Sequence, residues 1–306
     1  MIMDIFKPVL LKFWSITEKM DEKRIASQTP IGGITQITDI PYMNDSTKEH
    51  LLDIYYPENA TGKLPVIVDI HGGGWLYGYK EINKYYCLKL AEKGFLVASI
   101  NYRLARDYQF IDQIADAFSA FSWLSGNLES YPADTDNIFL VGDSAGGQIV
   151  SICAAICGSK KMQNDFGVTP TLTFRAVGAV CPAVDLLSPN FMMNVNLKSL
   201  LGDRPKTNPL YKYMDYKNVA YLGLPPFYIV TANGDFIKKQ AKKLKAILDR
   251  HGVENVFYYY DEKVDGKKLP HVFSVTNPYS APAEKEIQTM TDFFKSKIKT
   301  AAEVMS

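Results

Sequence analysis

The hydrophobic pattern of this chain changes character along its length. Within residues 1–32, apolar residues recur at helical spacing and charged residues lie mostly off that stripe, which predicts an amphipathic helix. Two short extended runs follow, at residues 34–42 and 51–57, and the turn residues between them predict an antiparallel pair of strands. Beyond residue 64, short apolar runs alternate with helical patterns.

This alternation predicts an α/β fold. The apolar runs are continuous in Val, Ile, Leu and Phe, which is typical of parallel strands that are buried on both faces. Helical patterns between the runs indicate β-α-β connections. The runs cover residues 65–70, 95–102, 137–143, 175–184, 227–235 and 255–262. We therefore expect a mostly parallel central sheet with helices on both faces.

Residues 186–226 break the alternation. They lie between two predicted core strands and are irregular and rich in Asn, Pro and Tyr. A segment this long between strands usually has a function of its own, such as a lid or a binding loop. The total of 306 residues fits either one domain with such additions or two small domains.

Composition and charge narrow the class of partner. With 47% hydrophobic and 22% charged residues, the chain has the composition of a globular protein. The net charge of +1 provides no basic excess for phosphates or an anionic membrane, so nucleic acid is not an expected partner. Oligomeric state stays open, because pairing of two copies leaves no sequence signature.

The cysteines and the N-terminus indicate the compartment. Four cysteines show no metal-binding spacing and are expected to be reduced core thiols. The apolar stretch at the N-terminus is interrupted by Asp4, Lys7 and Lys12, which is unlike a signal peptide or a membrane span. A cytoplasmic protein is therefore expected.

A G-x-S-x-G motif marks the candidate nucleophile. The sequence GDSAG at residues 142–146 follows an apolar strand and precedes a helix-compatible run. A sharp strand-to-helix turn holds the serine in a strained backbone conformation, and the flanking glycines avoid a clash there. Ser144 is therefore the candidate nucleophile, and the alternative is an inert serine in a tight turn.

The candidate base is found by elimination among four histidines. His271 lies after the last predicted strand, in a loop rich in Gly, Lys and Pro. It also follows the serine in the sequence, as the chain order Ser, acid, His of strand-turn-helix serine hydrolases requires. His251 precedes Gly252 at the end of a lysine-rich helix, where capping explains it. His50 lies before the main strands, and His71 is interpreted as a residue that orders its loop.

The acid that orients the base should lie between Ser144 and His271 at the end of a strand. Asp235 ends the run at residues 227–235 and is the first choice, with Asp185 as the alternative. Asp143, beside the nucleophile, is expected to form hydrogen bonds within its own turn.

Three successive glycines in HGGGW, at residues 71–75, suggest an oxyanion hole. Backbone N–H groups can face a ligand there without interference from side chains. The expected donors are the amides of Gly73, Gly74 and Ala145, with Gly72 as a further candidate. A flexible turn or a phosphate loop is the alternative, although the spacing of phosphate-binding motifs is absent. The supporting residues of the two motifs are His71, Trp75, Gly142, Asp143 and Gly146.

Together, HGGGW and GDSAGG resemble the two signatures of the α/β-hydrolase fold, specifically the hormone-sensitive-lipase-like carboxylesterases. The segments NYRLA at residues 101–105, DAFSAFSWL at 116–124 and LPHVF at 269–273 are also similar to segments of that family. The resemblance covers residues 65–275. It implies a serine carboxylesterase that needs no cofactor or metal and that hydrolyses short-to-medium acyl esters, acetylated sugars among them.

The resemblance also implies a cap over the site, which segments 1–32 and 186–226 would form. Because Ser144, Asp235 and His271 must converge on one sheet, the 306 residues are expected to form one α/β-hydrolase domain.

Some positions depart from the family pattern. Arg106 and Asp107 replace the usual Pro-Glu, Asp235 is followed by Phe236 and Ile237 where Asp-Pro-Leu is more frequent, and no glycine follows His271. These departures leave Ser144, Asp235 and His271 in place. They affect what the resemblance implies about the residues that face the substrate. Two other functions remain open. One is an arylformamidase or small amidase with the same three catalytic residues. The other is a non-catalytic receptor, as in family members that have lost the catalytic histidine, although His271 is present in this chain.

Overall fold

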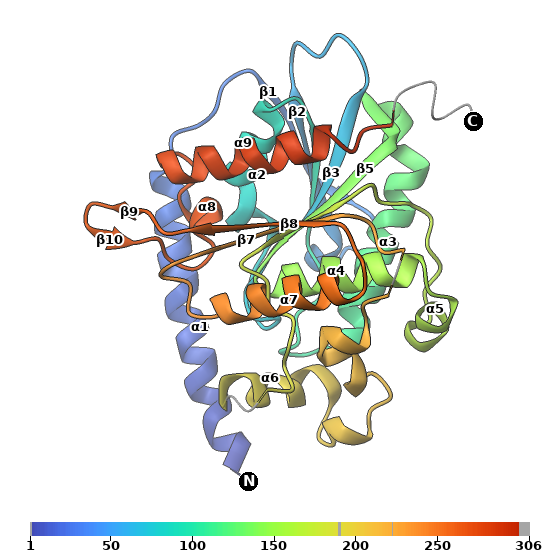
Figure 1. Cartoon of the computed structure of the whole chain (residues 1–306), viewed down its shortest axis with the longest axis vertical. Helices are drawn as coiled ribbons and strands as arrows, with labels where there is room; N and C mark the ends of the chain where they lie inside the picture. The colour runs from blue at the N-terminus through green and yellow to red at the C-terminus, as the bar shows by residue number, and fades with distance from the viewer. Residues whose placement is uncertain (1, 189–190, 222, 300–306) are drawn as a thin grey trace.

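A computed structural model describes residues 2–188, 191–221 and 223–299, which form an eight-stranded sheet with helices packed on it (Figure 1). The strand order is β1-β2-β4-β3-β5-β6-β7-β8. β2 pairs antiparallel with β1 and β4, and the other pairs are parallel, as the sequence predicts. The strands are β1 (Ile34–Pro41), β2 (Leu51–Pro57), β3 (Leu64–Ile70), β4 (Leu96–Ile100), β5 (Ala133–Asp143), β6 (Val177–Val180), β7 (Phe227–Ala232) and β8 (Asn255–Tyr260).

Helices cover both faces of the sheet because its strands are apolar on both faces. On β3, Val66 and Val68 belong to one apolar cluster with α3, α4 and α7, whereas Ile67 belongs to a second cluster with α2, α8 and α9. Figure 1 shows these two groups on opposite sides of the sheet. The helices are α1 (Ile2–Ser27), α2 (Lys84–Glu92), α3 (Phe110–Asn127), α4 (Ala145–Cys157), α5 (Lys160–Phe166), α6 (Phe191–Leu201), α7 (Lys238–Arg250), α8 (Phe273–Thr276) and α9 (Ala281–Lys295).

The segment 186–226 is more ordered than its sequence predicts. It contains α6 and three 3₁₀ turns, and Leu197, Leu200 and Leu201 of α6 are buried. The helix escapes prediction because Asn and Ser interrupt its apolar positions. Lys243 of α7 forms ion pairs with Asp185 and Asp215, which attach this segment to the body. Residues 189–190 and 222 of the segment, like Met1 of the N-terminal one, lie outside the described residues.

Other elements were also absent from the prediction. α5, α9 and the hairpin of β9 (Lys263–Val264) and β10 (Lys267–Lys268) have no counterpart in it. The predicted strand and helix boundaries otherwise differ by a few residues, as at β6, where only Val177–Val180 of the run at 175–184 is a strand.

α1 lies along the body and is attached by its polar and aromatic side chains. Trp14 stacks on Tyr77, with ring centroids 5.3 Å apart and planes at 15°. Tyr77 donates a hydrogen bond to Asp21 (3.0 Å), and Arg24 donates to the carbonyl of Ile82 (3.0 Å). Among the helices that the structure describes, none combines the length and the apolar character needed to cross a membrane.

A buried carboxyl group lies on α9. Glu286 is fully buried, and within the described part of the chain neither of its carboxyl oxygens has a hydrogen-bond partner. Burial raises the pKa of Glu286 to about 8, because it opposes the charged form more strongly than the nearby Ser274 and Tyr228 hydroxyls favour that form. Glu286 is therefore a titrating group with a direct influence on stability.

Replacing Glu286 by Gln should make the stability of the protein less dependent on pH. Folded wild type keeps the Glu286 proton up to about pH 8, whereas an unfolded glutamate releases it near pH ~4.3. The folded state therefore binds more protons in this window, and stability falls as pH rises through it. Relative to Glu286→Gln, wild type should lose up to about 1.4 kcal/mol of unfolding free energy per pH unit between about pH 5 and 8.

Urea unfolding of both proteins across that pH range measures the effect. Glu284→Gln, at an exposed position on the same helix, is the matched control and should parallel wild type. A difference between wild type and Glu286→Gln that does not vary with pH would contradict the assignment.

Candidate active site

Ser144 occupies a sharp turn between β5 and α4. Its backbone has φ 51° and ψ −113°, a left-handed conformation that is costly for a residue with a Cβ. Two backbone bonds hold it there: its N–H donates to Val180 and its carbonyl accepts from Ala183, both at 2.9 Å. A Cβ on Gly146 would lie 2.0 Å from the carbonyl oxygen of Ile70, so only glycine fits at that position.

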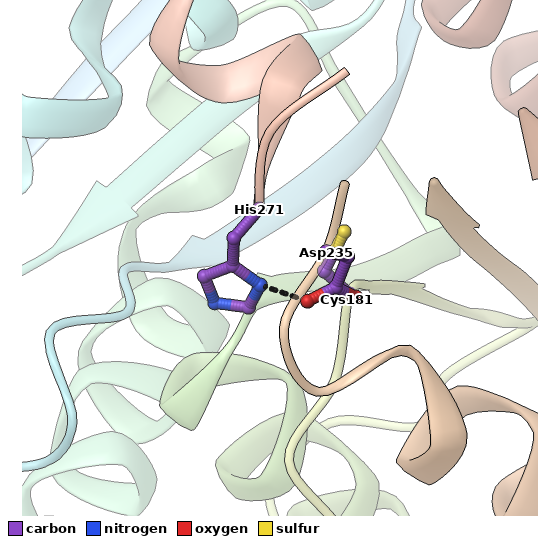
Figure 2. A group of neighbouring side chains, drawn as sticks. All are labelled: Cys181, Asp235 and His271. Carbon is purple, nitrogen blue, oxygen red and sulfur yellow. Dashed lines mark hydrogen bonds and ion pairs between the residues drawn. The ribbon is translucent and has the colours of Figure 1, made fainter. Parts of the chain in front are cut away.

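The structure brings together the three residues that the sequence indicates for catalysis. The Ser144 Oγ lies 2.9 Å from Nε2 of His271, and Nδ1 of His271 lies 2.7 Å from Oδ1 of Asp235. Figure 2 shows the second of these bonds, between the loops that follow β10 and β7. With its proton on Nδ1, His271 donates to Asp235 and accepts from the serine hydroxyl, which is the arrangement of a base poised to deprotonate Ser144.

Asp235 is held as a carboxylate. Burial opposes its ionisation, but hydrogen bonds donated by His271, by the Thr231 hydroxyl (2.6 Å) and by the Ile237 amide (2.9 Å) outweigh burial. The pKa of Asp235 consequently lies below its usual value. The alternative acid, Asp185, is instead paired with Lys243 at the base of the 186–226 segment.

Cys181 lies next to this pair. Its Sγ, a carboxylate oxygen of Asp235 and a ring nitrogen of His271 lie within 4.8 Å of one another, a grouping that resembles a metal site (Figure 2). Burial raises the pKa of the Cys181 thiol, so the thiol stays protonated, whereas a metal requires the thiolate. The His271 nitrogens already bond Asp235 and Ser144. The three groups therefore fit a hydrogen-bonded His271–Asp235 pair beside a protonated thiol better than a metal centre.

The glycine loop lies beside the nucleophile turn. Gly73 has φ 110°, and a Cβ there would lie 1.9 Å from the carbonyl oxygen of Tyr77, so the loop depends on glycine. The Gly72 amide donates to Asp143 Oδ1 at 2.9 Å and is therefore occupied. None of the described residues accepts a hydrogen bond from the amides of Gly73, Gly74 or Ala145. Of the four candidate donors, these three are the amides left available to a ligand.

A buried polar cluster fixes this loop from behind. Asp143 is expected to bond within its own turn, but its Oδ1 instead accepts from the Gly72 amide of the glycine loop and from the Asn83 side chain (2.9 Å). Asn83 donates to both oxygens of Asp69 as well, at 3.2 Å, and Ser99 donates to Asp69 at 3.0 Å. Burial raises the pKa of both aspartates, that of Asp69 to about 7 with the help of repulsion from Asp143. Sequence reasoning missed Asn83 and Asp69, because neither belongs to a motif.

His71 supports the loop rather than acting as a second base. Its ring stacks on Tyr102, with centroids 4.4 Å apart, and its Nδ1–H donates to the Gly72 carbonyl at 2.8 Å. Burial lowers the pKa of His71 to about 4, so the ring is neutral. On the outer side of the loop, a Cβ on Gly74 would lie 2.8 Å from the Trp14 ring of α1. The N-terminal helix thus packs directly on the loop.

The other two histidines lie elsewhere. His50 is paired with Asp45 and Asp116, and His251 ends α7 as the sequence indicates.

Comparison with known proteins places this site in a family. A model of the BD-FAE family matches residues 52–248, and the chain belongs to that family. The crystal structure of esterase B from Lactobacillus rhamnosis is 28% identical, with a TM-score of 0.90, and the alignment covers 96% of this chain and 95% of that one. A phosphonate-inhibited form of the same esterase matches equally well.

Curated relatives include two mycobacterial proteins. LipM of Mycobacterium tuberculosis, a probable carboxylic ester hydrolase, is 30% identical over 64% of this chain and 47% of its own length. The carboxylesterase NlhH of the same species is 28% identical over 77% of this chain and 73% of its own. The chain thus matches only about half of LipM. The similarities confirm the α/β-hydrolase fold and the carboxylesterase family that the motifs indicate.

Replacing Asn83 by Leu should impair catalysis without touching the triad. The change removes the only side-chain amide described between Asp69 and Asp143, and the Gly72 end of the loop loses its support. A displacement of roughly 1 Å of catalytic groups can cost about a hundredfold in rate. We expect kcat for p-nitrophenyl acetate to fall about tenfold to a hundredfold, with a much smaller change in KM.

Steady-state kinetics measure this effect, and the thermal midpoint shows whether the variant is folded. Asn164→Leu, at an exposed position on α5, is the control for the substitution itself. A kcat for Asn83→Leu within twofold of wild type would exclude a positioning role.

Proposed function

We propose that this protein is a serine carboxylesterase in which Ser144, His271 and Asp235 form the catalytic triad. The observation that carries the proposal is the chain of hydrogen bonds from the Ser144 hydroxyl through His271 to Asp235, at 2.9 and 2.7 Å. The strained turn that presents Ser144 and the free amides beside it support the same function. Membership of the BD-FAE family and the esterases among its relatives agree with it.

The geometry implies a two-step reaction. The Ser144 proton moves to Nε2 of His271 while Oγ bonds to the ester carbonyl carbon. The carbonyl oxygen becomes an oxyanion, which the amides of Gly73, Gly74 and Ala145 stabilise. The bond to the alcohol then breaks, and Nε2–H protonates the departing oxygen. Water repeats the sequence on the acyl-enzyme and releases the acid and free Ser144.

The residues around Ser144 and His271 have separate roles in this scheme. Asp235 keeps the imidazole in the tautomer that accepts from Ser144 and stabilises the imidazolium that forms. Asp143, Asn83 and His71 act as positioning residues, because they hold the loop and make no contact with a substrate in this scheme.

The proposed substrates are esters of short-to-medium acids. Esterase B has been crystallised with C4-C4 and C6-C4 phosphonate inhibitors, which supports acyl groups of that size. Acetylated sugars are a narrower candidate, carried by the family resemblance alone. A small-molecule ester is the proposed partner.

We further propose that the chain is a single α/β-hydrolase domain with a two-part cap. The three triad residues come from loops of one sheet, which supports one catalytic unit. Trp14 of α1 packs on Gly74, and the 186–226 segment is attached through Lys243. These contacts support a cap in which both segments border the substrate.

Replacing Ser144 by Ala should abolish ester hydrolysis, because the attacking oxygen is removed. Loss of a triad nucleophile typically lowers kcat by about a millionfold. Wild type and Ser144→Ala are compared on p-nitrophenyl acetate and butyrate, and a fluorophosphonate probe reports on the nucleophile directly. The probe should label wild type and leave Ser144→Ala unlabelled.

Ser151→Ala, at a buried position of α4, is a matched control that should retain labelling. Hydrolysis retained by Ser144→Ala would exclude the triad, and an unlabelled wild type would favour the receptor alternative. Faster turnover of N-formylkynurenine than of either ester would favour the arylformamidase.

A further inference from the structure

An exposed aromatic side chain lies beside the catalytic base. Phe236 is 73% exposed, more than any other large apolar side chain whose burial the structure describes. Its ring centroid is 4.5 Å from that of His271, with the planes at 55°. Because this exposed ring lies against the proposed catalytic base, a ligand in the site can cover it.

The backbone around Phe236 holds the ring at this place. Asp235 accepts from the Ile237 amide (2.9 Å), and its own amide donates to the Ala232 carbonyl (3.2 Å). Ile237, the next residue, is buried. A further bond from the Gly234 amide to the Leu269 carbonyl (3.0 Å) ties this loop to the one that carries His271. Phe236 is therefore fixed between two anchored neighbours and points outward beside the imidazole.

The geometry of the proposed reaction indicates which part of a bound substrate lies beside the Phe236 ring. Nε2 of His271 must come within hydrogen-bond distance, about 3 Å, of the alcohol oxygen in order to protonate it. The carbon atoms attached to that oxygen then lie close to the His271 ring, against which Phe236 packs. The acyl chain is bonded to the carbon that Ser144 attacks, so it extends from the ester group in a different direction from the alcohol part.

We propose that Phe236 is the apolar wall of the subsite for the alcohol part of the ester, and that this subsite favours aromatic alcohols. This inference rests on the proposed esterase function and extends it to the leaving group. An aryl or arylmethyl group would stack against Phe236 and cover apolar surface that is exposed in the free protein. Such a contact gives a preference of up to about tenfold over a small aliphatic alcohol.

A second role for Phe236 would be to shield the His271–Asp235 hydrogen bond from water. That role would change the basicity of His271 and would affect all esters by the same factor. The ratio between two esters with the same acyl group therefore separates the two roles.

The test compares benzyl acetate with ethyl acetate. Both have the same acyl group, and their alcohols are of similar acidity, so intrinsic reactivity cancels when each variant is compared with wild type. We expect Phe236→Ala to lower kcat/KM for benzyl acetate about five- to tenfold more than for ethyl acetate. Phe236→Leu, which keeps an apolar side chain without the ring, should lie between Phe236→Ala and wild type.

Tyr259→Ala removes a different exposed ring, on β8, and should retain the wild-type ratio. Equal losses on both esters, or no loss on either, would overturn the inference. Fluorophosphonate labelling of every variant separates this result from the proposed function. Labelling with an unaltered ratio refutes only the alcohol subsite, whereas failure of wild type to label refutes the esterase itself.

Discussion

The close contact between β3 and β5 at their carboxyl ends is the constraint on which the site depends. The two strands are parallel neighbours with Ile70 opposite Gly142, so the loops that follow them begin at one edge of the sheet. The first turn of α4 then passes so near β3 that a Cβ on Gly146 would lie 2.0 Å from the Ile70 carbonyl oxygen. Only with glycine there can the turn that carries Ser144 lie against the glycine loop. This closeness is also what lets Asp143 on one loop accept from Gly72 on the other.

Two buried polar features lie on the face of the sheet that α2, α8 and α9 cover, and they have different roles. Asp69 and Asp143 share the amide of Asn83, so burial is partly compensated by hydrogen bonds, and the cluster holds the loop in one position before a substrate arrives. Glu286, on α9 of the same face, shares no side-chain amide of this kind in the described structure and is kept neutral by burial. The first cluster has a geometric role at the site. Glu286 has none there, and its influence is on stability.

The sequence predicts those parts of the site that local motifs encode. Ser144, His271, Asp235 and the glycine loop follow from strand-to-helix and strand-to-loop patterns, because each element is specified by adjacent residues. Asn83 could not be found in this way, since its partners Asp69 and Asp143 are distant in sequence and meet only through the order of the strands. The position of Phe236 was visible as a departure from the family. Its exposure was not, because it follows from the burial of Ile237 and the anchoring of Asp235.

These findings divide the site into a fixed part and a variable part. The groups proposed to act on the ester bond are held by backbone bonds, buried carboxyls and glycines, where most substitutions would cause a clash or leave a charge unpaired. The groups proposed to meet the rest of the substrate are Phe236, α1 and the 186–226 segment. A substitution at an exposed ring such as Phe236 disturbs little of the fold, because few of its atoms are packed. Substitutions in this variable part could therefore change the alcohol that is accepted while the proposed triad geometry is retained.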